Sequence, residues 1–276
     1  MPLVNTNLDK LNFSKLYKKQ VKNSTFKSKK SSDWDKKAKQ FNENVLNSPY
    51  IKEFISKIDI KDCQTLLDVG SGPANISLQL APKLEKVYAL DYSLEMLNLA
   101  KENAKNLEIN NLITIHKSWY DKWNDVPNAD IVIASRSMEV KNIRKALKKL
   151  NEKANKKVYI TTKVGGSFID NEILNQLKRK INPRPDYIYL INTLHSMGIF
   201  AKVDFIKTKN NKLQVKTDEE FIQKVSWSLG KLTKKEEIIL KEYFNNTYKH
   251  KKEADYLTWA FISWEKLYNP SYEYIS

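Results

Sequence analysis

The chain has 276 residues and a formal net charge of +16, and its length suffices for one substantial core with an added subdomain. The single cysteine, Cys63, excludes an internal disulfide, a zinc site built from cysteines and a cysteine-ligated iron–sulfur cluster. No apolar run approaches the ~18 residues that cross a bilayer, and the first residues lack the apolar core of a signal peptide, so we expect a cytoplasmic protein without a membrane partner.

The basic excess is made almost entirely of lysine. Only four of the 48 basic residues are arginines, the residue type that makes bidentate phosphate and base contacts. Half of the net charge lies in residues 1–40, where 11 lysines meet three aspartates. We predict that residues 1–32 form a lysine-rich N-terminal arm. This arm is either a solvated tail or loosely packed helix, or an electrostatic contact for RNA or another anionic partner.

Two helices are expected next, over residues 33–60. A serine or aspartate within residues 31–33 can cap the first helix. Four apolar residues at helical spacing define its buried face: Trp34, Ala38, Phe41 and Val45. The pair Ser48-Pro49 then ends this helix and precedes the second one.

Strand-like and helix-like segments alternate through residues 61–276, without an internal repeat. This alternation indicates an α/β fold with a doubly wound, mostly parallel sheet and right-handed crossovers. Strands are expected at 65–69, 86–90, 112–116, 130–134, 157–163, 201–207 and 256–264, and helices at 75–83, 93–106, 140–154, 170–180 and 186–197. Roughly 45 residues separate the last two strands and contain the helical stretches 218–226 and 234–248. We expect this helical insert, at about 213–250, to act as a substrate lid or as an interface.

The first strand leads into a glycine turn, in the sequence TLLDVGSGPANI of residues 65–76. Asp68 lies near the end of the apolar run, and Gly70 and Gly72 follow it, although the whole chain has only six glycines. The order strand, glycine turn, helix is typical of the nucleotide-binding half of a doubly wound domain. Asp91 closes the next strand about 20 residues later, the spacing at which a carboxylate reaches a ribose hydroxyl.

Two types of cofactor compete for this turn. The dinucleotide fingerprint G-x-G-x-x-G needs a third glycine at position 75, where the chain has Asn75. The variant G-x-G-x-x-A fails too, because Ala74 comes one residue early. A carboxylate at Asp68, just ahead of the turn, suits an ammonium group better than a pyrophosphate.

The turn resembles motif I of the class I S-adenosylmethionine (SAM) methyltransferases, with Ala74 in place of the third glycine. Asp91-Tyr92-Ser93-Leu94-Glu95-Met96-Leu97 is similar to the D-x-S-x-x-M-L segment of that family, and the resemblance covers residues 34–165 well. It implies a seven-stranded Rossmann-like sheet with an antiparallel pair at one edge, and SAM as the cofactor with S-adenosylhomocysteine (SAH) as product. The cofactor-binding residues that it implies are Asp68, Gly70, Ser71, Gly72, Asp91, Tyr92, Met96, Ser118, Trp119 and Ser135.

The resemblance leaves two aromatic positions open. Trp119 either stacks on the adenine or packs in a helix–sheet seam. Trp34 and Phe41 fit W-D-x-x-A-x-x-F, which resembles the entrance helix of small-molecule methyltransferases, and they either cover the cofactor or only pack in the core.

Candidate catalytic residues follow the fourth and fifth strands, which the resemblance places beside the transferred methyl group. Arg136 and Lys163 are expected to meet an acidic group of the substrate. The alternative is that Arg136 pairs with Glu139 or Asp121 for structural reasons. The pair Gly165-Gly166 indicates either a close approach of backbone to ligand or a simple turn.

A hydroxyl, phenol or acidic carbon as acceptor needs a general base. His195 is the first candidate, and the others are Asp186, Tyr187 and His116. Three further aromatic residues either line a pocket or pack in the core: Trp227, Trp259 and Trp264.

The family's known substrate signatures are missing: N-P-P-Y or D-P-P-Y, a Pro-Cys pair, and the paired glutamates of arginine methyltransferases. Three functions therefore stay open. The first is methylation of a small-molecule acceptor, the second is methylation of tRNA or rRNA with the basic arm, and the third is SAM binding without catalysis. The oligomeric state is not predicted.

Overall fold

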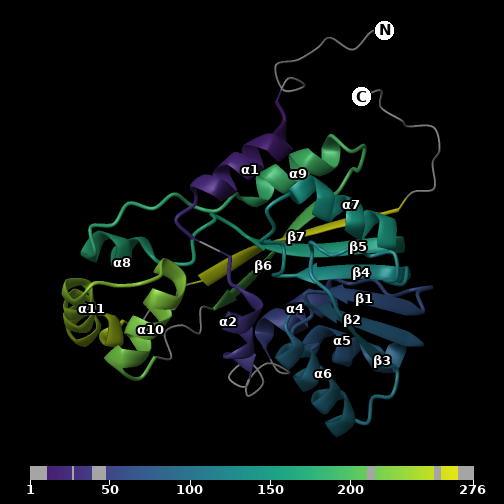
Figure 1. Cartoon of the computed structure of the whole chain (residues 1–276), viewed down its shortest axis with the longest axis horizontal. Coiled ribbons are helices and arrows are strands. Elements are labelled where there is room, and N and C mark those ends of the chain that lie inside the picture. The colour runs from purple at the N-terminus through teal and green to yellow at the C-terminus, as the bar shows by residue number, and fades with distance from the viewer. Residues whose placement is uncertain (1–10, 27, 39–47, 210–214, 252–255, 267–276) are drawn as a thin grey trace.

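The computed structural model describes residues 11–26, 28–38, 48–209, 215–251 and 256–266. Seven strands form one sheet in the order β3-β2-β1-β4-β5-β7-β6 (Figure 1). The strands are β1 Thr65–Val69, β2 Lys86–Asp91, β3 Leu112–His116, β4 Ala129–Ser135, β5 Ala154–Lys163, β6 Lys202–Lys209 and β7 Tyr256–Glu265. Strand β7 runs antiparallel to both β5 and β6, whereas the pairs among β1 to β5 are parallel. The predicted fold class and the antiparallel pair at one edge of the sheet are confirmed.

Helices cover both faces of the sheet. The α-helices are α1 Phe13–Asn23, α2 Ser31–Asp35, α4 Pro49–Ser56, α5 Asn75–Leu80, α6 Leu94–Asn106, α7 Ile143–Lys153, α8 Asn171–Gln176, α9 Tyr187–His195, α10 Asp218–Leu229 and α11 Lys234–Asn246, with 3-10 turns η1 Ala81–Lys83 and η3 Tyr248–His250. Adjacent strand residues point to opposite faces, so Leu67 packs with α1, α7 and α9, and Leu66 packs with α4 and α5.

Several helices are shorter than the apolar periodicity predicts. The predicted helix 75–83 changes to a 3-10 turn at Ala81, beside Pro82. The helix predicted over 140–154 begins only after Asn142, whose side chain accepts the N–H of Lys145 in the first turn. Helix α9 begins after Asp186, whose side chain accepts the N–H of Tyr187. Phe41 and Val45, which were expected on the buried face of the entrance helix, lie outside the described residues.

Part of the predicted N-terminal arm is packed on the domain. Tyr17 of α1 is buried in the core shared with α7 and α9, and its hydroxyl donates to the carbonyls of Val140 (2.9 Å) and Met138 (3.3 Å). The lysines of α1 stay exposed. Residues 13–23 are therefore a fixed helix with a basic outer face.

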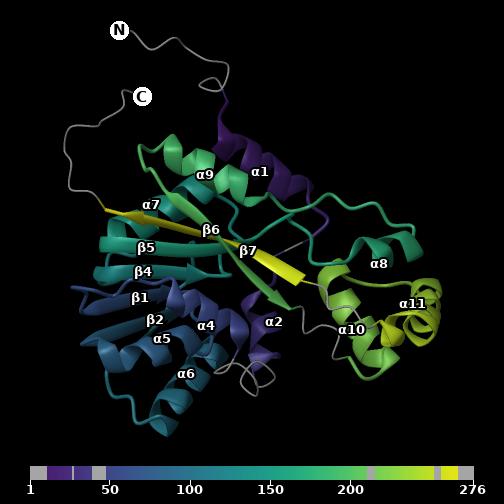
Figure 2. The ribbon, with the colours of Figure 1, turned by 180° about the vertical axis from the view of Figure 1, so that it is seen from behind.

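The helical insert forms a separate small core beyond the carboxyl ends of the strands, with α8, α10 and α11 side by side (Figures 1 and 2). Helix α8 belongs to the β5–α9 connection and was not part of the expected insert. Arg179, just after α8, donates to both carboxylate oxygens of Glu236 in α11 (2.5 and 2.8 Å), which lowers the pKa of Glu236 to about 2. Two connections that are distant in sequence thus build one subdomain.

No helix among the residues that the structure describes combines the length and the apolar character that a bilayer-spanning segment requires.

Candidate functional site

The glycine turn is held against two neighbouring strands. Gly70 has a φ of +70°, and a Cβ atom there would lie 2.4 Å from Cβ of Ser137, so both the backbone and the space require glycine. The hydroxyl of Ser137 donates to the carbonyl of Val69 (2.6 Å). The N–H groups of Gly70 and Ser71 donate to the carbonyl of Leu90 (2.7 and 3.1 Å). The turn is therefore rigidly placed at the carboxyl edge of the sheet.

Asp91 lies directly across this turn. Its Oδ2 accepts the N–H of Gly72 (2.8 Å) and its Oδ1 accepts the N–H of Ser93 (2.9 Å). A carboxylate has about four acceptor positions, so both oxygens can still accept from hydroxyl groups. Met96 lies next to Gly72, because a Cβ atom at Gly72 would be 3.9 Å from the Sδ atom of Met96. The predicted residues Gly72, Asp91 and Met96 thus come together.

Asp68 is the second acid of the turn and is almost fully buried. Its Oδ2 accepts the hydroxyl of Ser77 in α5 (2.6 Å). The pKa of Asp68 is raised to about 7, mainly by burial and also by the charge of Asp91, while the hydrogen bond from Ser77 acts in the opposite direction. Asp68 can therefore gain a charge near neutral pH, and a cation beside it would favour that charge.

Helix α2 lies over the end of β2. Ser93 Oγ donates to Asp35 Oδ1 (2.5 Å), and the hydroxyl of Tyr92 donates to the carbonyl of Lys29 (3.2 Å). Ser93 also caps α6, since its side chain accepts the N–H of Met96. Residues 28–38, called the entrance segment here, are thus bonded to the residues that follow Asp91.

Trp119 is bonded to Ser137, the residue that packs against the glycine turn. Its indole N–H donates to the carbonyl of Ser137 (3.1 Å), and its ring packs 5.4 Å from the ring of Trp123. Ser118 is part of a turn in which its N–H and hydroxyl both donate to Asp121 Oδ2 (2.7 and 2.9 Å). The structure therefore places Trp119 beside Ser137 and in contact with the core, and its stacking on adenine stays a prediction.

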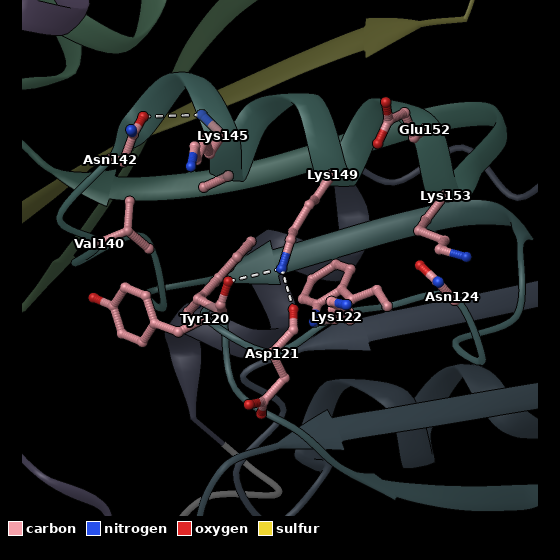
Figure 3. A pocket seen from close by; sticks show the side chains of 13 residues that line it. Tyr120, Asp121, Lys122, Asn124, Val140, Asn142, Lys145, Lys149, Glu152 and Lys153 are labelled. Carbon is pink, nitrogen blue, oxygen red and sulfur yellow. Dashed lines mark hydrogen bonds between the residues drawn. The ribbon is translucent and has the colours of Figure 1, made fainter.

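An open cavity of about 510 Å³ lies next to this loop, between residues 119–124 and α7 (Figure 3). Four lysines line it together with three aromatic residues: Lys122, Lys145, Lys149, Lys153, Trp119, Tyr120 and Trp123. Lys149 is engaged by the loop itself, because it donates to the carbonyls of Trp119 (2.8 Å) and Asp121 (2.6 Å). The lining of this cavity includes no residue of the glycine turn.

Arg136 directly follows β4 and has a φ of +57°. This left-handed conformation costs about 1–2 kcal/mol for a residue with a Cβ atom. Its N–H donates to Oγ1 of Thr161 (3.0 Å). Its guanidinium lies 4.3 Å from the ring centre of Tyr50 and 5.9 Å from that of Trp259. The side chain is therefore held on two aromatic rings.

The expected structural partners of Arg136 are occupied elsewhere. Glu139 pairs with Arg184 (3.2 Å), and Asp121 accepts from Ser118. Among the described residues, no carboxylate forms an ion pair with Arg136. The alternative of a structural ion pair from Arg136 to Glu139 or Asp121 is wrong.

Tyr50 is a residue that the sequence did not single out. Its hydroxyl lies 2.8 Å from Oγ of Ser135 and 2.6 Å from Oγ1 of Thr161, so α4 is joined to the ends of β4 and β5. Burial raises the pKa of Tyr50, against the lowering effect of the Arg136 charge. Ser135, predicted to bind the cofactor, is thus part of a three-hydroxyl cluster.

Residues 60–270 match the family model described as a methyltransferase domain. The chain belongs to the class I SAM-dependent methyltransferase family. An uncharacterized protein of Haemophilus influenzae is 33% identical over 258 residues, which cover 92% of this chain and 96% of that protein.

Two solved structures illustrate that the fold is shared at low sequence identity. The YcgJ protein of Bacillus subtilis has a TM-score of 0.54 and 12% identity, over 79% of this chain and 97% of that one. Coclaurine N-methyltransferase, bound to N-methylheliamine and SAH, has a TM-score of 0.50 and 11% identity, over 94% and 96%. At such identities the similarity shows the methyltransferase fold alone.

Lys163 of this methyltransferase lies half-buried at the end of β5, opposite Trp259 of β7. Its ammonium donates to the carbonyl of Val164 (3.2 Å). Burial lowers the pKa of Lys163, although the charges of Asp170 and Asp186 oppose this. Arg136 and Lys163 thus both lie at the carboxyl edge, as predicted from the strand order.

His195 is not brought to this edge. Helix α9 begins beside Gly165, whose N–H donates to Asp186 (3.1 Å), and its nine residues extend about 13 Å. The following strand β6 starts at Lys202, which is level with Tyr159 in the middle of β5, so α9 runs back along the sheet. His195 lies exposed at the far end of α9, away from Asp68 and Asp91, and this direction of α9 removes its expected role as base.

Of the other candidate bases, only His116 lies beside a residue predicted to bind the cofactor. It is opposite Asp91 in the strand register, and its Nε2 is 3.2 Å from the carbonyl of Tyr92. Asp186 is engaged in capping, since it also accepts the N–H of Tyr187 (2.6 Å). The ring of Tyr187 packs against Phe205.

The pair Gly165-Gly166 permits a close approach of backbone to backbone. A Cβ at Gly166 would lie 2.0 Å from the carbonyl oxygen of Arg184, whose N–H donates back to Gly166 (2.8 Å). Arg184 is buried and also donates to Ser28 (3.0 Å). Gly166 thus allows two parts of the β5–α9 connection to pass each other closely, next to Ser28 of the entrance segment.

Proposed function

We propose that the protein transfers the methyl group of SAM to a small-molecule acceptor. The observation that carries this proposal is the pair of buried carboxylates, Asp68 and Asp91, on the two sides of the rigid glycine turn. Asp91 has acceptor positions left for ribose hydroxyls, and Asp68 suits the ammonium group of the cofactor. The residues present therefore fit SAM.

When bound, SAM supplies a methyl group that its sulfonium already activates, so the chain has to align the acceptor and exclude water. The turn with Asp91 holds the nucleoside end. Helix α2, bonded to Ser93 and Tyr92, lies over this place and limits the access of water. Tyr92, Met96 and Trp119 would then surround the base.

A covered site favours a small acceptor over RNA. Trp34 of α2 packs at 5.7 Å against Trp227 of α10, and Lys37 lies 3.8 Å from the ring centre of Trp227. Lys29 also donates to the carbonyl of Trp227 (2.5 Å). The insert is thus joined to the entrance segment, and together they form a cap over the carboxyl edge.

The test combines SAM calorimetry with methyl-labelled SAM added to cell extract that is divided into metabolite and nucleic-acid fractions. We expect binding, with label in the metabolite fraction. Label in the nucleic-acid fraction would identify an RNA methyltransferase, and binding with label in neither fraction would indicate a non-catalytic SAM-binding protein. Absence of SAM binding would refute the proposal.

The role of the basic arm is tested by substitutions and not by a deletion, because a deletion would also remove Tyr17 from the core. The exposed lysines of α1 are suitable: Lys15, Lys18, Lys19 and Lys22. Their change to Gln should leave methyl transfer to the metabolite fraction unaltered. A strong loss together with weaker RNA binding at low salt would support the RNA alternative.

A further inference from the structure

Arg136 differs from the other three arginines in what holds its charge. Arg179 and Arg184 pair with Glu236 and Glu139, and Arg144 donates to the hydroxyl of Ser196. Arg136 has only the faces of aromatic rings as partners within the described ranges. Stacking uses the flat face of a guanidinium and leaves the N–H groups at its edge free to bind.

The backbone of Arg136 is fixed on both sides. Ser135 is bonded to the hydroxyl of Tyr50, and Ser137 donates to the carbonyl of Val69. The N–H of Arg136 is bonded to Thr161 at the same time. A strained backbone conformation persists only where its surroundings determine it in this way, and such positions cluster at ligand sites.

The rings under the guanidinium are fixed as well. Tyr50 is buried and its hydroxyl is bonded to both strand ends, while Trp259 packs edge-on against it at 5.7 Å. Trp259 is also the register partner of Lys163. A second cation therefore stands on the adjacent strand, where its ammonium lies 5.9 Å from the ring centre of Phe168.

This cationic place adjoins the proposed cofactor turn. Ser137, the next residue after Arg136, packs directly against Gly70. An acceptor group held by Arg136 would thus lie next to the part of the site that the cofactor occupies. The two neighbouring places also carry opposite charges. Asp68 and Asp91 at the turn suit a cationic cofactor, whereas Arg136 and Lys163 suit an anionic acceptor.

We infer that the methyl acceptor carries an oxyanion, a carboxylate or a phosphate, which the edge of the Arg136 guanidinium binds on the Tyr50–Trp259 platform, with Lys163 on the adjacent strand. A planar guanidinium matches both oxyanions through two parallel N–H bonds. This inference rests on the proposed function and names the acceptor class for the same site.

The experiment titrates the SAH-saturated full chain with succinate and, separately, with inorganic phosphate, followed by calorimetry. We expect at least one probe to bind, and Arg136→Gln to weaken this binding at least tenfold while SAH affinity stays unchanged. Arg144→Gln, the matched control, removes an equal charge on α7 and should leave the probe's affinity as it is. Tighter binding of succinate would indicate a carboxylate acceptor, and tighter binding of phosphate a phosphorylated one.

Arg136→Lys is a second variant that guards against a folding defect, because it keeps the positive charge but cannot form the two parallel N–H bonds. We expect it to lose probe affinity by about threefold or more, which is less than the loss in Arg136→Gln. The inference is overturned when neither probe binds, or when Arg136→Gln and Arg144→Gln bind the probe alike. Failure of SAH to bind would instead refute the proposed function, and the anion titration can then be run on the ligand-free chain.

Discussion

The two halves of the site are built in different ways. On the cofactor side, each of the two acids is bonded to a residue close in sequence, Asp68 to Ser77 and Asp91 to Gly72, which are 9 and 19 residues apart. On the acceptor side, Tyr50 bonds to Ser135 and Thr161, which are 85 and 111 residues away. The two acids are therefore positioned within one strand–turn–helix–strand unit, whereas contacts between distant segments assemble the acceptor side.

The halves also differ in charge. The glycine turn is flanked by two buried carboxylates, Asp68 and Asp91, while the ends of β4 and β5 carry Arg136 and Lys163. An acidic half suits a cationic cofactor, and a basic half suits an anionic acceptor. The local half can be altered by single substitutions in the turn, which gives the largest expected effects.

Gly70→Ala should have the largest effect on stability. The added Cβ meets Ser137 at 2.4 Å and the φ is +70°, so strain and overpacking together should lower the free energy of unfolding by about 2–5 kcal/mol. Gly72→Ala is the matched control, because its φ is +55° and its Cβ would meet only Met96 Sδ, at 3.9 Å. Denaturant titration should show about 1–2 kcal/mol for this control. Equal losses for the two variants would mean that the turn is not tied to Ser137.

Asp91→Ala should weaken SAH binding by about 1–3 kcal/mol, because it removes the acceptor for the ribose hydroxyls and leaves two backbone N–H groups unpaired. Calorimetry measures this loss. Asp125→Ala serves as control, since Asp125 is exposed and forms an ion pair with Lys117. SAH affinity unchanged by Asp91→Ala would contradict the ribose assignment.

The affinity for SAH should rise with pH, because its ammonium group favours the charged form of Asp68. With a pKa of about 7, Asp68 is mostly protonated at pH 6 and mostly charged at pH 8, so the affinity should increase about tenfold between these values. Asp68→Asn should flatten the profile. A pH profile of the same slope in both proteins would assign the titration to another group.

The stability of the ligand-free protein should follow the opposite course. The folded chain holds a proton on Asp68 that the unfolded chain releases near the usual pKa of about 4. The contribution of Asp68 to the free energy of unfolding is thus fully present below about pH 4 and is lost as the pH rises through about 7. Unfolding titrations of the wild type and of Asp68→Asn across this range measure it.

The smallest effect concerns the cap. A double-mutant cycle of Trp34→Leu and Trp227→Leu should give a coupling of about 0.5–1.5 kcal/mol in the free energy of unfolding, because the two rings pack edge to face. Trp34→Leu combined with Phe200→Leu is the control, since Phe200 is exposed and packs against His195. A coupling no larger than that of the control would show that the insert is not joined to α2.

The sequence was sufficient for the parts that depend on local patterns. The strands at 65–69 and 112–116 have the predicted bounds, because apolar runs end at polar turn residues, and the glycine turn with Asp91 lies at the strand ends as expected. The fold class followed from the alternation of strands and helices.

Other features depend on contacts that no local pattern encodes. Tyr50 reads as an ordinary apolar position of a helix, and only the fold brings it to Thr161. His195 was misplaced because a helical pattern does not show the direction in which a helix crosses the sheet. Likewise, the packing of α8 against α11 requires knowledge of where two separate connections meet.

The most direct test is a crystal structure of the chain with SAH. We predict density along the glycine turn, with the ribose hydroxyls within hydrogen-bond distance of Asp91 and the amino group on the side of Asp68. Density only in the cavity beside α7, or bound SAH that contacts neither carboxylate, would contradict the account.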